Sequence, residues 1–280
     1  MKTALFGLAL AAFCTAALAQ SAGHAGHVMP AASAAMPAAG DGAPAVGSLP
    51  SSDGGGGRRY DEYGIHPHML DDAVSWRLGF EKFGLAQLRD GSSAAQWDGQ
   101  FWIGNDRDKL VVESEGEKAA GRSDAFAQAF WSHAISPYWD LRLGARRDFG
   151  SEAARNWAAL GLAGALPYNI ETQLTAYAGG SGRTALRLQA EYDFLITQRL
   201  VFTPEVEAMA YGKTDRQRET GSGLAQGSLS LQLRYEVTRQ FAPYVGVSFS
   251  RKFGNTASMA RDAGQSVSDR AWLMGVRFWF

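Results

Sequence analysis

Beyond its first 19 residues, the 280-residue sequence lacks any long apolar run. Each membrane-crossing helix needs about 20 predominantly apolar residues, so this absence argues against a helical membrane protein. The one apolar run, from Met1 to Ala19, has Lys2 before its core of Leu, Ala and Phe and closes with Ala17-Leu18-Ala19, which is a small-x-small cleavage pattern. We therefore predict a cleaved signal peptide over residues 1–19 and an exported mature chain.

Cysteine is almost absent, because the single one, Cys14, lies inside the predicted signal peptide. A mature chain without thiols has no disulfide framework and no cysteine-based metal site in the oxidising space beyond the inner membrane. The formal net charge of -1 gives no indication of a nucleic-acid partner.

Large apolar side chains are scarce between Gln20 and Arg59, where Ala, Gly, Ser and Pro dominate and the segment ends in four consecutive glycines. Such a segment cannot bury enough surface to offset its chain entropy. We predict a disordered tail over residues 20–72, in which the part from Tyr60 to Asp72 is a transition to folded structure.

From Ala73 onward, apolar and polar residues alternate with period two, which is typical of strands with two different faces. After Gly227, one face carries Leu229, Leu231, Leu233 and Tyr235, and the other carries Ser228, Ser230, Gln232, Arg234 and Glu236. A soluble sandwich would bury the apolar face and leave the charged face in water. In a membrane barrel the arrangement is inverted, so that apolar residues contact lipid and charged residues line the lumen.

Strand length and connection length favour the barrel. About twelve strands approach the roughly ten residues that cross a bilayer at a tilt, and they begin near Ala73, Gln96, Lys109, Asp124, Trp139, Asn156, Asn169, Thr184, Leu200, Leu224, Ala242 and Arg270. Short connections alternate with generally longer ones, of which Gln87 to Ala95, Lys213 to Ser222 and Gly254 to Asp269 are the clearest. We predict an all-β fold, an antiparallel up-and-down transmembrane β-barrel of the outer membrane over residues 73–280. An even number of strands puts both chain ends, including the N-terminal tail, on the periplasmic side.

The last strand ends on the aromatic residue Phe280. This ending resembles the signal by which outer-membrane assembly machinery engages barrel precursors. The alternative is a buried closing strand of a soluble sandwich.

Several segments resemble the copper resistance protein B family of outer-membrane proteins. The most specific are WDGQFWIGNDRDKL from Trp97, SHAISPYWDLRLGARRDFG from Ser132, SGRTALRLQAEYDFLITQRL from Ser181 and LRYEVTRQFAPYVGVSFSRKFGNTA from Leu233. The resemblance implies a role in copper tolerance, with copper bound at the periplasmic side of the barrel or within it, and periplasmic copper-resistance proteins as partners. Family members commonly carry a tail of repeated Met, His and Asp, whereas this tail is mostly alanine and glycine.

Two groups of residues ahead of the barrel are candidate copper ligands, because copper favours imidazole and, when reduced, thioether ligands. The preferred group is His66-Pro67-His68-Met69, in which the proline keeps the segment extended and places both imidazoles on one side. Its alternative role is a linker that plugs the barrel without metal. The second group lies in the tail, where the alternative is a polar segment with incidental histidines, and comprises His24, His27, Met29 and Met36.

Met209 is the one candidate ligand within the barrel. Its register with Glu205, Glu207 and Tyr211 predicts a lumenal position, where it would relay copper or simply pack. His133 shares a face with Trp131 and is expected to pack at the membrane interface. The lumenal charges mix both signs, which favours salt bridges that fill the lumen, with a cation path as the alternative.

The leading functional hypothesis is a copper-binding outer-membrane protein that sequesters periplasmic copper or aids its passage outward, with outer-membrane lipid around it. The alternative is a passive pore for small solutes. A hydrolase would need a histidine beside a nucleophilic serine, but Ser132 alternates to the face opposite His133, so no enzymatic activity is expected.

Overall fold

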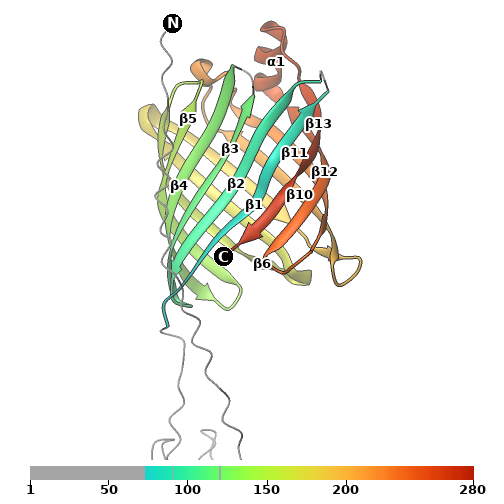
Figure 1. The fold of residues 1–280 in the computed structure, drawn as a ribbon. Helices are drawn as coiled ribbons and strands as arrows, with labels where there is room; N and C mark the ends of the chain where they lie inside the picture. The colour runs from blue at the N-terminus through green and yellow to red at the C-terminus, as the bar shows by residue number, and fades with distance from the viewer. Residues whose placement is uncertain (1–72, 90, 120) are drawn as a thin grey trace, which may run out of the picture. The chain divides into compact units, whose positions relative to one another are not determined.

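A computed structural model describes residues 73–89, 91–119 and 121–280 as a closed antiparallel sheet (Figure 1). The predicted signal peptide, the tail and seven candidate ligands lie outside these residues, namely His24, His27, Met29, Met36, His66, His68 and Met69. The strands are β1 (Ser75–Leu88), β2 (Ser93–Gly104), β3 (Asp108–Ala119), β4 (Arg122–Ser136), β5 (Trp139–Gly150), β6 (Arg155–Leu166), β7 (Ile170–Gly179), β8 (Arg183–Glu191), β9 (Phe194–Leu195), β10 (Leu200–Tyr211), β11 (Gly223–Tyr235), β12 (Phe241–Lys252) and β13 (Ser268–Trp279).

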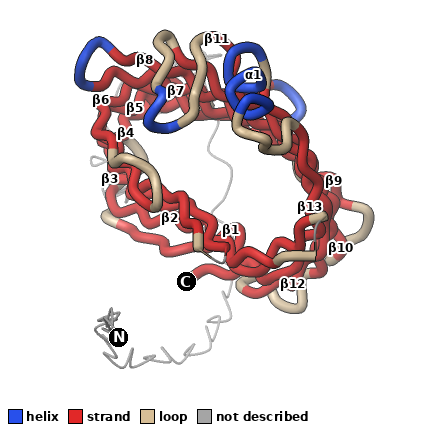
Figure 2. Tube along the Cα trace, turned by 90° about the horizontal axis from the view of Figure 1, so that it is seen from above, coloured by secondary structure: helices blue, strands red, loops and turns tan. Residues whose placement is uncertain are grey.

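The sheet closes because β1 pairs with both β2 and β13, and each intervening strand pairs with its neighbours along the chain. Figure 2 shows the resulting ring from above. The two-residue β9 and the longer β8 both pair with β10 and together form one position in the ring, interrupted at Tyr192 and Asp193. The ring therefore has twelve strand positions, which confirms the predicted barrel of about twelve strands.

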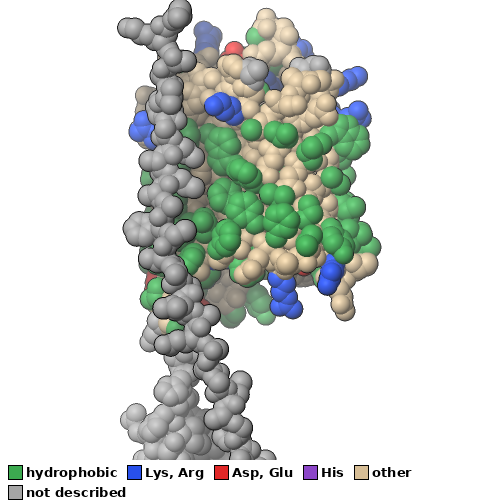
Figure 3. All heavy atoms as spheres, viewed as in Figure 1, with side chains coloured by type: hydrophobic (Ala, Val, Ile, Leu, Met, Phe, Trp, Pro, Cys, Tyr) green, Lys and Arg blue, Asp and Glu red, His purple; other side chains and the backbone are tan. Residues whose placement is uncertain are grey.

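Alternation gives the barrel an apolar outer surface. On β13 the outward side chains Trp272 and Met274 are 58% and 50% exposed, whereas Leu273 between them is buried. Figure 3 shows the hydrophobic side chains as a band on the face over β1, β2 and β13, with Lys and Arg at its upper and lower edges. This exposed apolar belt suits lipid rather than water. No helix in the described part of the chain is long and apolar enough to cross a membrane.

The two ends of the barrel differ. The terminal end is the end at which β1 begins and β13 finishes, and its connections are short, as predicted. The opposite end, called the loop end, carries the two long connections, residues 212–222 and 253–267. The second of these is not simply a polar loop, because it contains helix α1 (Gly254–Asp262), which buries Thr256, Ala257 and Ala260.

One predicted long connection is wrong. Between Gln87 and Ala95 the chain turns within residues 89–92, because strand pairing continues to Gln87 and Ser93. The paired lumenal side chains Ala86 and Ala94 are both buried. Their packing stabilises the β1–β2 pairing in a region where the sequence is already polar.

A β-bulge in β1 controls which charges face the lumen. Glu81 and Lys82 together oppose the single residue Asp98 of β2. The bulge directs both side chains inward, where Glu81 pairs with Arg277 at 2.6 Å and Lys82 pairs with Glu205 at 2.6 Å. Outward alternation resumes at Phe83 and Leu85, which are 53% and 47% exposed.

Candidate functional site in the barrel lumen

The lumen is partly filled by an apolar cluster on the side of β3 to β8. Phe130, 1% exposed, and Trp157 and Tyr177 pack with smaller side chains from β3, β6 and β8. The polar atoms of these rings are satisfied, because Trp157 Nε1 donates to Asp148 at 2.8 Å and Tyr177 Oη donates to Gln128 at 3.0 Å. The lumen is therefore a packed interior on this side.

A layer of charged residues ties opposite walls together, and we call it the central layer. Its members are Lys82, Asp98, Glu115, Arg187, Glu205 and Glu207. Arg187 on β8 reaches Glu115 on β3 at 2.6 Å, five strand positions away around the ring, and it also contacts Glu207 at 2.7 Å. Lys82 on β1 reaches Glu205 on β10 at 2.6 Å. The pairs Arg187–Glu115 and Lys82–Glu205 join strands that share no backbone ladder, whereas Glu207 lies on β10, the ladder neighbour of β8.

Further charge pairs lie between the central layer and the terminal end. Arg142 donates to Glu113 at 3.0 Å and to Gln173 at 3.3 Å. Arg234 donates to Asp193, which also accepts a hydrogen bond from Thr203 at 2.7 Å. The lumen below the central layer is thus occupied by a second set of ion pairs, as the mixed charges predict.

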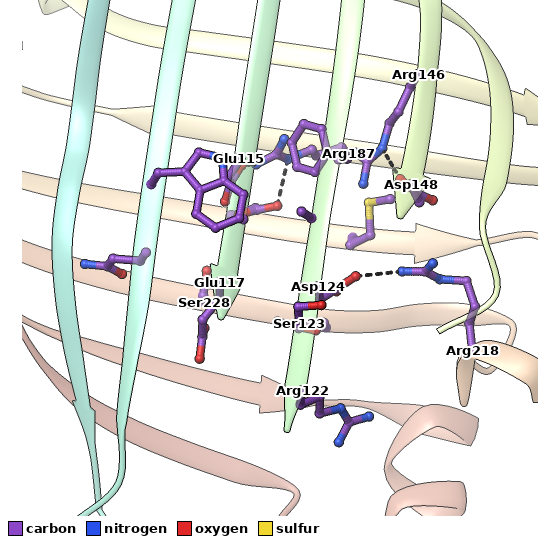
Figure 4. A pocket seen from close by; sticks show the side chains of 18 of the residues that line it. Glu115, Glu117, Arg122, Ser123, Asp124, Arg146, Asp148, Arg187, Arg218 and Ser228 are labelled. Atoms are coloured by element: carbon purple, nitrogen blue, oxygen red, sulfur yellow. Dashed lines mark hydrogen bonds and ion pairs between the residues drawn. The ribbon is translucent and has the colours of Figure 1, made fainter. Parts of the chain in front are cut away.

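On the other side, a polar cavity of about 440 Å³ lies between the central layer and the loop end. We call it the vestibule, and Figure 4 shows its lining. Three arginines in it are already paired, since Arg187 contacts Glu115, Arg146 contacts Asp148 at 2.7 Å, and Arg218 contacts Asp124 at 3.0 Å. The lining carboxylate of Glu117 has no ion pair or hydrogen bond within the described residues.

The long connections meet above the vestibule. Asp215 accepts hydrogen bonds from Arg155 at 2.9 and 3.2 Å and lies 3.0 Å from Arg183. These contacts, above all the hydrogen bond from Arg155, lower the pKa of Asp215 below its usual value. Helix α1 joins the same assembly, because Thr256 accepts a hydrogen bond from the Gly221 amide at 2.8 Å. The mouth is therefore a linked structure rather than two independent loops.

Met209 has the predicted lumenal position, because it lines the vestibule and packs against the apolar cluster. The carboxylates near it are committed to cations, since Glu207 and Glu115 both contact Arg187. Among the described residues, no group of three or more His, Cys, Asp and Glu side chains is arranged to hold a metal ion. The structure thus gives Met209 a packing environment, and His133, the histidine within residues 73–280, lies on the outer face of β4 and not beside it.

His133 and Ser132 lie on opposite faces of β4, as their alternation predicts. The Nδ1 atom of His133 lies 2.8 Å from Asp108, which also accepts a hydrogen bond from Trp131 at 2.9 Å. Ser132 is buried and donates to Asp140 at 2.9 Å. The serine and the histidine therefore do not contact each other, and His133 is part of an interfacial cluster.

Several lumenal residues escape sequence reasoning. Strict alternation from Phe80 would turn Lys82 toward lipid, and that conflict is itself the signal of a bulge, which returns Lys82 to the lumen. Arg146 lies 3.8 Å from the ring centroid of Phe126 and faces inward with Arg142 and Asp148. Their period-two spacing along β5 would have identified them as a lumenal face.

The chain is similar in sequence to proteins of one described family. The family described as Copper resistance protein B precursor (CopB) matches residues 75–280. The chain is 41% identical over 225 residues to a copper resistance protein B homolog of Pseudomonas syringae pv. tomato, and 42% identical over 225 residues to copper resistance protein B of Escherichia coli. Each comparison covers 80% of this chain and 73% of the relative.

Among solved structures, the NanC porin matches with a TM-score of 0.47 and 14% identity, over 74% of this chain and 99% of that one. The KdgM porin matches with a TM-score of 0.45 and 13% identity, over 74% and 99% of the two chains. The family match extends over every barrel strand, from the first residue of β1 to Phe280, and the resemblance seen in the sequence motifs is confirmed. The chain belongs to the copper resistance protein B family.

Proposed function

We propose that this protein binds periplasmic copper through histidine and methionine residues ahead of its barrel, and that the barrel holds them at the outer membrane. The observation that carries the proposal is the match of the whole barrel to a copper-resistance family. On this view the protein sequesters copper or helps to pass it outward, in exchange with periplasmic copper-resistance proteins.

The chemistry of the chain supports a site before the barrel. The mature sequence has no thiol, so imidazole and thioether are its soft ligands. His66, His68 and Met69 provide two imidazoles and one sulfur within four residues. Chain length alone keeps Met69 within roughly 20 Å of Ser75, because an extended residue spans at most about 3.6 Å. His24, His27, Met29 and Met36 form a second, more distant set.

The contacts inside the barrel support an anchoring role over free passage. The central layer and the pairs below it fill the lumen with side chains that form ion pairs with one another, and each lysine or arginine of the central layer contacts two carboxylates. A mobile cation entering this region would have to displace arginine or lysine from its carboxylate partner. We therefore propose that the lumen conducts little. We also propose that the terminal end of the barrel, where its chain begins and finishes, faces the periplasm, as an even number of strand positions allows.

Copper titration of the purified full-length protein tests the proposed site. We expect the variant H66A/H68A/M69A to lose at least tenfold in Cu(II) affinity, followed by absorbance and electron paramagnetic resonance. The matched control is H133A/M274A, which removes an imidazole and a thioether from the outer surface of the barrel and should bind as the wild type does. Equal binding by the wild type and the triple variant would reject the site.

Conductance in planar bilayers tests the barrel separately. We expect small currents that do not change when micromolar copper is added. A large, steady conductance in the wild type would instead establish the protein as a passive pore.

A further inference from the structure

Three arginines near the loop end project from the outer surface of the barrel. Arg251 of β12 and Arg270 of β13 alternate outward with Phe249 and Trp272, and Arg89 follows the end of β1. All three are exposed, and none forms an ion pair within the described residues. This contrasts with Arg146, Arg187 and Arg218 in the vestibule, which have carboxylate partners. Three unpaired cations on a membrane-facing surface would be stabilised by an anion from another molecule.

The same arginines border an apolar groove of about 670 Å³. One wall is a row of directly paired residues on neighbouring strands, in which Val206 opposes Leu229 and Leu229 opposes Phe249. Phe249 in turn opposes Arg270, so the apolar row ends in a guanidinium. The side chains of Val206, Leu229 and Phe249 are 38% to 50% exposed, and they are therefore available to a ligand in the membrane.

The floor of the groove is formed by small residues one row closer to the loop end. There Ala208 opposes Gly227, and Gly227 opposes Arg251. A side chain at Gly227 would come within 3.2 Å of the Phe253 ring, so the glycine keeps the floor low beside that ring. This row also ends in a guanidinium. The groove thus combines an apolar surface across β10, β11 and β12 with arginines from β12 and β13 at one of its ends.

We propose that this groove binds an acyl lipid whose phosphate-bearing headgroup has a net negative charge, taken from the leaflet at the loop end. The apolar row and the small-residue floor accept a chain, while Arg251 and Arg270, with Arg89 at the rim, bind the phosphate. Arginine suits this role because its planar guanidinium donates two parallel hydrogen bonds to phosphate oxygens. Glu207 of the central layer borders the groove, but none of the candidate copper ligands lines it. The site is therefore independent of the proposed copper site.

Native mass spectrometry of the full-length protein in an uncharged detergent tests the proposal, with diphosphoryl lipid A as the probe. We expect saturable binding of lipid A and at least tenfold weaker binding of phosphatidylcholine, which carries no net charge. R251Q/R270Q should lower the affinity for lipid A about 30-fold, the ordinary contribution of two interfacial arginines. Copper binding by this variant should equal that of the wild type.

The matched control is R147Q, which removes another outward, exposed arginine on the far side of the ring, on β5, and should bind lipid A as the wild type does. A208F fills the groove from a lipid-facing position without changing any charge, and should also weaken binding at least tenfold. Equal affinity of the wild type and R251Q/R270Q, or equal loss in R147Q, would overturn the proposal. Electrophoretic mobility before and after heating verifies that each variant is folded.

Discussion

Replacement of Arg187 by methionine tests whether the central layer stabilises the barrel. The Arg187 side chain is 9% exposed and contacts two carboxylates, Glu115 at 2.6 Å and Glu207 at 2.7 Å. Removing one partner of a buried ion pair costs about 3–5 kcal/mol, because the remaining charge is left uncompensated. Here the side chains of Glu115 and Glu207 are 32% and 27% exposed, which allows partial hydration, so we expect a loss near the lower limit, about 3 kcal/mol.

Urea unfolding in lipid vesicles, followed by tryptophan fluorescence, measures this loss as a shift of the midpoint at constant slope. The charge-neutral variant E115Q/R187M/E207Q should recover at least half of it, because no unpaired carboxylate remains. R183M is the control, since its ion pair with Asp215 lies at the mouth, and it should cost about 1 kcal/mol or less. A loss below about 1 kcal/mol in R187M would show that the layer is fully hydrated, and would refute the reasoning.

Three further predictions concern other parts of the barrel. F130A should lower the free energy of unfolding by about 3–5 kcal/mol in the same urea assay, because it empties the centre of the lumenal cluster, and a loss below about 1 kcal/mol would show that the cluster is loosely packed. The lowered pKa of Asp215 means that its anchoring of residues 212–222 is complete above the usual value of 3.8 and is lost as pH falls through the lower folded value. Hydrogen exchange of that connection should therefore accelerate only below about pH 4 in the wild type but already at pH 7 in D215N, and equal protection at pH 7 would contradict the anchor. M209L should change stability by less than about 1.5 kcal/mol and leave copper titration unchanged, whereas a loss of copper binding would place a ligand in the vestibule.

Period-two patterning was sufficient to predict the barrel, because a membrane imposes the same two-sided environment on every strand. The predicted strand starts fall within three residues of those observed, and the outward set of β13 is as expected. Patterning fails where the ladder depends on pairing rather than on polarity, as at residues 89–92, and where a connection buries its own residues, as in α1.

The candidate site was less predictable. Alternation placed Met209 and Arg187 in the lumen, but it could not show which carboxylates each cation contacts across the ring. Such partners depend on the closure of twelve strand positions and on their tilt, which local sequence does not encode. The candidate copper ligands ahead of the barrel remain predictions, since they fall outside the described residues.

The bulge in β1 has a consequence for assembly of the barrel. Glu81 and Lys82 contact Arg277 and Glu205, so the first strand to be synthesised carries charges whose partners are more than 120 residues later. Until β10 and β13 are in place, those charges stay in water. Closure of the ring is therefore the step that neutralises them, and a strand registered one residue out of place would aim Lys82 into hydrocarbon. The bulge thereby increases the free-energy difference between the correctly closed barrel and a barrel closed with β1 shifted by one residue.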